Sequence, residues 1–160
     1  AIYNAILARR PDYIDELCRG YVYHMRGEHP TGHPEITEHR VPIFSYHAGK
    51  LSSRYTRNSI LLGAKHLGHP LTEREREPLD LVDQLAEELC LDISFQAGDI
   101  QLLSNHSVMH ARTDFEDHPG PEHKRDLLRV LNLPNGRPLT YEFAARYGPG
   151  SARMGVPLVK

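Results

Sequence analysis

Two histidines four residues apart are candidates for side chains that carry out chemistry. His106 and His110 lie in the stretch NHSVMHARTDF, residues 105–115. A catalytic non-haem metal site needs two or three imidazoles or carboxylates directed at one point. In a strand, residues of equal parity share a face, but Ser104 and Asn105 are typical of a turn. The stretch therefore predicts His110 as the histidine that a strand holds, with His106 in the preceding turn.

On this stretch alone, a hydrogen-bonded interior histidine is the simpler explanation of His110. The sequence RDLLRVLNL, residues 125–133, supplies a second group, because as a strand it places Arg125 and Arg129 on one face among leucines. An arginine on an inward face keeps its charge and needs a carboxylate partner, which its planar fork binds through two parallel hydrogen bonds. A solvated outer face with salt bridges to Asp126 or Glu122 explains the pattern equally well.

Helices and a hairpin are expected before these segments. Residues 1–20 predict two short helices that meet at Pro11, and residues 71–91 predict the clearest helix, with Thr72 and Glu75 as a capping box. The firm part of that helix is expected at residues 78–90, since Pro78 suits a first turn. Between the helices, the sequence predicts a strand at 21–27, a polar loop at 27–40 and a β-hairpin at 41–57 that turns at residues 48–50.

After the long helix, short β-rich runs follow one another at residues 92–96, 97–105, 107–112 and 125–133. Runs of this length, separated by Gly, Asn or Pro, are typical of an antiparallel barrel or sandwich. The tail from Pro134 has turn residues and little periodicity, so we expect it on the surface.

The composition restricts the class of protein. A chain of 160 residues with 39% apolar and 25% charged residues has the balance of one globular domain. A net charge of -2 gives no general attraction for nucleic acid or an anionic membrane, and no apolar run or leader signal predicts a membrane span. Cys18 and Cys90 lie far apart, which predicts half-buried thiols without a disulfide in a reducing compartment, the cytoplasm.

Taken together, GDIQLLSNHSVMHARTDFED and KRDLLRVLNLPNGRPL resemble the C-terminal half of the TauD/TfdA-type iron(II)- and 2-oxoglutarate-dependent dioxygenases. The segments VPIFSYHAGKLSSRYTRNSI and LTERERE resemble the same family in the same order, so the resemblance covers most of the chain. It implies a mixed α/β, mainly β fold that is part of a double-stranded β-helix, or jelly roll, with flanking helices. In this family two histidines and a carboxylate bind the iron.

The resemblance also implies roles for individual residues. His110 matches the distal histidine ligand of the iron, and Arg125 matches the arginine that binds the far carboxylate of 2-oxoglutarate. Arg129 matches a position that often faces the substrate. The cofactors implied are Fe(II), 2-oxoglutarate as co-substrate and O2. Residues with a weaker claim to substrate binding are Tyr55, Arg57 and Asn105, for which a polar hairpin arm and a turn are the simpler explanations.

The chain departs from the family pattern at the other two iron ligands, which the family carries in an HxD or HxE motif on an early strand. One H-x-acid triplet is present, His33-Pro34-Glu35, so an alternative triad joins His33 and Glu35 to His110. A loop around a proline does not direct two side chains at one metal, which disfavours this triad. We therefore expect residues 1–160 to be the C-terminal portion of a longer dioxygenase domain, starting after the first iron ligands.

The leading hypothesis is an oxygenase that hydroxylates a small organic substrate, with release of succinate and CO2. The 160-residue chain is expected to be inactive by itself, because a single histidine does not hold iron tightly. The alternative is a non-catalytic jelly-roll remnant or binding module with an arginine-lined pocket. Two arginines suggest an anionic substrate, and the sequence is compatible with a homo-oligomer.

Overall fold

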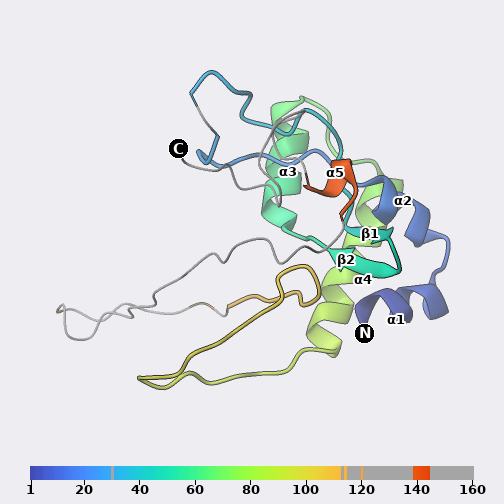
Figure 1. The fold of residues 1–160 in the computed structure, drawn as a ribbon. Coiled ribbons are helices and arrows are strands. Elements are labelled where there is room, and N and C mark those ends of the chain that lie inside the picture. Colours follow the sequence, from blue (N-terminus) through green and yellow to red (C-terminus); the bar gives the residue numbers. More distant parts are fainter. Residues whose placement is uncertain (30, 113, 115–119, 121–138, 145–160) are drawn as a thin grey trace.

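The computed structural model describes residues 1–29, 31–112, 114, 120 and 139–144 (Figure 1). Within them the chain is mixed α/β, with helices around a single two-stranded sheet. The elements are α1 (Ile2–Arg9), α2 (Tyr13–Arg19), β1 (Phe44–His47), β2 (Lys50–Ser53), α3 (Arg57–His66), α4 (Glu73–Glu88) and α5 (Tyr141–Ala144). The expectation of a mainly β chain is wrong for these residues, and the jelly roll that the resemblance implies is not confirmed.

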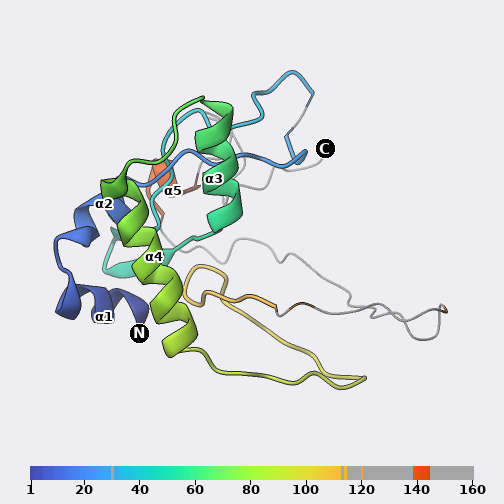
Figure 2. The ribbon, with the colours of Figure 1, turned by 180° about the vertical axis from the view of Figure 1, so that it is seen from behind.

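The N-terminal helices and α4 form the packed part of the molecule. Both α1 and α2 contact α4, and α2 also contacts β1 (Figures 1 and 2). The two predicted N-terminal helices are confirmed, and α2 ends at Gly20, where φ is 77° and a Cβ would lie 2.2 Å from the Val41 carbonyl oxygen. Only glycine fits this position. The buried core consists of Ile6, Leu17, Tyr21, Tyr23, Val41, Ile43, Phe44, Ile60, Leu79, Val82 and Leu85.

The hairpin is confirmed in a shorter form than predicted. Antiparallel pairing joins β1 to β2 from Phe44 opposite Ser53 to His47 opposite Lys50. The turn uses Ala48 and Gly49, both at positive φ. The strand expected at 21–27 is reduced to two isolated bridges, Tyr21 with Val41 and His24 with Ile36.

Helix α4 begins with the predicted capping box. The Glu75 backbone N–H donates to Thr72 Oγ1 at 3.3 Å, and the Thr72 N–H donates to Glu75 Oε2 at 3.1 Å. The helix therefore starts at Glu73, five residues before the predicted firm part, and contains Pro78. On its core-facing side Leu79, Val82 and Leu85 are buried, whereas Leu89 is exposed at the C-terminal end.

We expect Thr72→Ala to lower the free energy of unfolding by about 1 kcal/mol, because it leaves the first N–H groups of α4 without their side-chain acceptor. Thr72→Ser keeps the acceptor oxygen and should cost only a fraction of this. Urea unfolding followed by circular dichroism measures both. Equal losses in the two variants would contradict a capping role for the hydroxyl.

The strands predicted after α4, at residues 92–96, 97–105 and 107–112, are absent from the structure. In both ribbon views this part of the chain runs away from the helices and returns (Figures 1 and 2). Most of its apolar side chains are exposed, for example Ile100 at 87% and Leu102 at 90%, whereas Met109 packs against the core. The strand predicted at residues 125–133 lies outside the described residues.

Two smaller expectations concern the cysteines and the membrane. Cys18 and Cys90 are free, as predicted, but both are exposed rather than half-buried. Among the described residues, no helix combines the length and the apolar character that crossing a membrane requires.

Candidate functional site

The two histidines of the NHSVMH stretch have different environments. His106 is buried against Phe143 of α5, with ring centroids 5.4 Å apart, and its carbonyl oxygen accepts from the Ser53 N–H at 2.8 Å. The predicted turn is confirmed, because the Ser107 N–H donates to the Ser104 carbonyl at 2.9 Å. His110 is exposed and lies in no strand. Tertiary contacts thus fix His106, and the strand expected to hold His110 is missing.

The predicted 2-oxoglutarate and substrate contacts are only partly described. Arg125 and Arg129 lie outside the described residues. Asn105 is described and is exposed within the turn. The roles of Arg125, Arg129 and Asn105 in binding 2-oxoglutarate and substrate stay predictions.

Tyr55 and Arg57 connect the start of α3 to α4. The Tyr55 hydroxyl donates to Asp83 Oδ1 at 2.6 Å, and Arg57 Nη1 donates to Asp83 Oδ2 at 2.7 Å. Arg57 also pairs with Asp80. Burial raises the pKa of the Tyr55 phenol, and its hydrogen bond to Asp83 raises that pKa further, so the hydroxyl remains a donor. These contacts give both side chains a structural role, and substrate binding by them stays a prediction.

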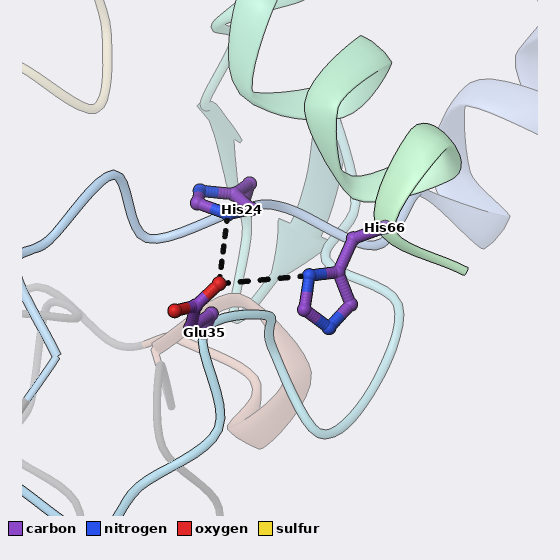
Figure 3. Close-up of side chains that lie close together, drawn as sticks. All are labelled: His24, Glu35 and His66. Atoms are coloured by element: carbon purple, nitrogen blue, oxygen red, sulfur yellow. Dashed lines mark ion pairs between the residues drawn. The ribbon is translucent and has the colours of Figure 1, made fainter. Parts of the chain in front are cut away.

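The structure brings together a different group of metal-binding side chains. His24, Glu35 and His66 each offer one ligand atom, and these atoms all lie within 4.8 Å of one another (Figure 3). Within the described ranges this is the one group of three histidine, cysteine or acidic residues with such spacing. The alternative triad of His33, Glu35 and His110 is therefore not assembled, since Glu35 groups with other histidines.

Neither His24 nor His66 was singled out by the sequence. One lies in an irregular segment and the other in the last turn of α3, so no local spacing connects them. Tertiary packing alone makes them neighbours, with ring centroids 5.8 Å apart. The spacing of His24, Glu35 and His66 in the sequence matches no metal-binding motif.

The described residues do not by themselves fit a catalytic iron at His110. Non-haem iron of this class needs two histidines and a carboxylate, and His110 belongs to no group of three donors in the part of the chain that the structure describes. His24, Glu35 and His66 have the right donor types, but none of them matches a ligand position in the resemblance. His110 can at most supply one ligand of an iron site whose other ligands lie outside the described residues.

Comparisons with known proteins agree with the resemblance of the segment that carries His110, Arg125 and Arg129. The family model for the taurine catabolism dioxygenase TauD, TfdA family matches residues 1–131. The chain is 34% identical over 142 residues to FR-33289 synthase of Streptomyces rubellomurinus (strain ATCC 31215), covering 85% of this chain and 41% of that protein. It is 32% identical over 158 residues to taurine hydroxylase-like protein SAT17 of Stachybotrys chartarum (strain CBS 109288 / IBT 7711), covering 96% of this chain and 38% of that protein.

The span matched by the family model contains both His110 and the segment with Arg125 and Arg129. The chain spans only about two fifths of the length of the two relatives. Any activity of the relatives therefore belongs to molecules more than twice the length of this chain.

Proposed function

Because the chain belongs to the TauD/TfdA family of dioxygenases, we propose that it is part of an Fe(II)- and 2-oxoglutarate-dependent oxygenase. The reaction is hydroxylation of a small organic molecule, with 2-oxoglutarate and O2 converted to succinate and CO2. The observation that carries this proposal is the family match over residues 1–131, which includes the His-then-Arg segment. Family membership supports an oxygenase-type enzyme, and the specific reaction is our proposal.

In this proposal His110 is one of the iron ligands. Its imidazole is exposed, so an iron ion can reach it, and the proposal requires the rest of the domain to fix its position. The other ligands come from outside the described residues. We further propose that residues 1–160 form part of one jelly-roll domain, in which the apolar side chains exposed at 91–102 are covered.

A second candidate function rests on the incomplete donor set around His110. A jelly-roll binding module without iron would keep the arginine-lined pocket and bind a carboxylate ligand, but it would not turn over 2-oxoglutarate. Binding of 2-oxoglutarate that is unaffected by removal of Fe(II), with no succinate formed, would favour this module over the oxygenase.

Arg125 and Arg129 have different roles in this proposal. We assign the far carboxylate of 2-oxoglutarate to Arg125, because a guanidinium binds a carboxylate through two charge-assisted hydrogen bonds. We assign the organic substrate to Arg129, which agrees with a small anionic molecule. The net charge of -2 agrees with a partner other than nucleic acid, and the two free cysteines agree with a cytoplasmic location.

We expect Arg125→Ala, in the complete gene product, to raise the KM for 2-oxoglutarate about 10- to 100-fold, because charge-assisted hydrogen bonds contribute about 1.5–3 kcal/mol. Arg129→Ala is the matched control, with an unchanged KM for 2-oxoglutarate and an altered KM for the organic substrate. Succinate formation at varied 2-oxoglutarate concentration measures both. If Arg129→Ala raised the KM for 2-oxoglutarate and Arg125→Ala did not, the two roles would be exchanged.

A further inference from the structure

We propose that His24, Glu35 and His66, a group that does not include His110, bind a divalent transition-metal ion, best matched by Zn²⁺. The ion would join the segment that carries His24 and Glu35 to the end of α3. This inference does not rest on the proposed oxygenase function, because it needs only residues that the structure describes.

The distances place the carboxylate between the two imidazoles. Glu35 Oε2 lies 3.5 Å from His24 Nε2 and 3.6 Å from His66 Nδ1 (Figure 3). Ligand atoms about 2.0–2.1 Å from a tetrahedral zinc ion are roughly 3.3 Å from each other. The two carboxylate–imidazole spacings are therefore close to those of a bound ion. The ligand atoms of the two imidazoles lie within 4.8 Å of each other.

The backbone holds His24 and Glu35 in place without an ion. His24 is bridged to Ile36, the residue after Glu35, and the Met25 N–H donates to the Glu35 carbonyl at 2.7 Å. The His24 N–H donates to the Ser59 carbonyl of α3 at 2.9 Å. Two of the three ligands are thus pre-positioned, which reduces the conformational entropy that binding must overcome.

Helix α3 brings the third ligand to the same point. A Cβ at Gly63 would lie 2.4 Å from the Val22 carbonyl oxygen, so only glycine allows the helix to approach the 22–24 segment this closely. His66 follows one turn later, in the last turn of α3. The C-terminal end of a helix carries partial negative charge, which favours a bound cation.

Binding of the ion would change the tautomer of the His24 ring and its hydrogen bond with Arg26. His24 Nδ1 accepts from the Arg26 backbone N–H at 2.9 Å, so the ring hydrogen is on Nε2 and faces the Glu35 carboxylate. When Nε2 binds the metal, the ring hydrogen is on Nδ1 instead. Nδ1 can then no longer accept the hydrogen bond from the Arg26 N–H, and that hydrogen bond breaks. Arg26 lies in an exposed turn at a φ of 53°, so its N–H can turn to solvent.

The donor set selects the kind of ion. Two neutral imidazoles and one carboxylate suit zinc and other borderline first-row ions, whereas magnesium and calcium prefer oxygen ligands alone. Glu35 and His66 are exposed, so solvent can reach the site and water can complete the coordination.

The test is titration of the chain with ZnCl2 by isothermal calorimetry, after treatment with a chelator. We expect one tight equivalent of zinc. Glu35→Gln and His66→Ala should each weaken that equivalent at least 10-fold, since each removes one of three protein ligands. His69→Ala is the matched control, because it removes an exposed histidine just beyond α3 that is outside the group, and it should leave zinc affinity unchanged.

Folding of the variants is checked by circular dichroism, and both altered side chains are largely exposed, Glu35 at 55% and His66 at 43%. A measurement on the unmodified chain needs no variant at all: zinc should shift the ring NMR signals of His24 and His66 before those of other histidines. The proposal is overturned if the unmodified chain binds no zinc. It is equally overturned if folded Glu35→Gln and His66→Ala retain full affinity, or if zinc shifts the signals of other histidines first.

Discussion

His110→Ala is expected to lower 2-oxoglutarate turnover by the complete gene product by at least about 100-fold. Loss of partners that only orient a metal ligand already costs about 10- to 100-fold in metal affinity or activity, and a ligand contributes more than its supporting partners. The measurement is succinate formation at saturating 2-oxoglutarate and at an Fe(II) concentration just sufficient for the unmodified protein. The loss should be partly recovered at high Fe(II), because the defect lies in metal binding.

His106→Asn is the control for this prediction, because it alters the other histidine of the same stretch. His106 is packed against Phe143 and carries no proposed chemistry. We expect the variant to be less stable than the unmodified protein but to retain turnover per folded molecule. Equal losses of turnover in the two variants would mean that the stretch acts through folding, and an active His110→Ala would remove His110 from the iron site.

The second large effect concerns stability. Leu79→Ala is expected to lower the free energy of unfolding by about 3 kcal/mol, within the range of about 2–5 kcal/mol for buried leucines, because it leaves a cavity in the core. Leu79 is 0% exposed and belongs to the core cluster shared with α1, α2 and the hairpin.

Urea unfolding of the chain measures this loss, and Leu61→Ala is the matched control. Leu61 undergoes the same chemical change on α3, where it is 42% exposed, so its cost should stay below about 1 kcal/mol. If Leu79→Ala were no more destabilising than Leu61→Ala, the helices could not be packed around the core described above.

Local sequence signals predicted α1, α2, α4 and the hairpin because those elements satisfy their backbone hydrogen bonds within short stretches. Thr72 and Glu75 identified the start of α4, and Gly49 identified the hairpin turn. Helix α3 was missed, although Ile60 and Ala64 lie four residues apart on its buried face. Its glycine at position 63 weakens the helical signal but is required by the close contact with Val22.

The strands expected at residues 92–96, 97–105 and 107–112 were predicted from alternation of apolar and polar residues, and the structure lacks them. Alternation indicates which residues would share a face, but a strand also needs a partner for its backbone groups. Residues 91–103 have no ladder partner among the described residues, so their apolar side chains remain exposed. Pairing with distant strands is a property of the whole domain, which local alternation does not contain.

The two candidate sites also differ in how far the sequence predicts them. His110 and Arg125 were proposed because a family motif keeps them close in sequence. His24, Glu35 and His66 come from a bridged loop and a helix end, and only the packing of α3 against residues 22–24 makes them neighbours. No spacing rule relates them, so the structure was needed to identify the group.

The proposed function requires His110 to be an iron ligand of a 2-oxoglutarate-dependent oxygenase. The direct measurement is the visible metal-to-ligand charge-transfer band that forms when Fe(II) and 2-oxoglutarate are added anaerobically to the complete gene product. We expect this band in the unmodified protein and in His106→Asn, and its loss in His110→Ala. A band of full intensity in His110→Ala, or no band in the unmodified protein, would contradict it.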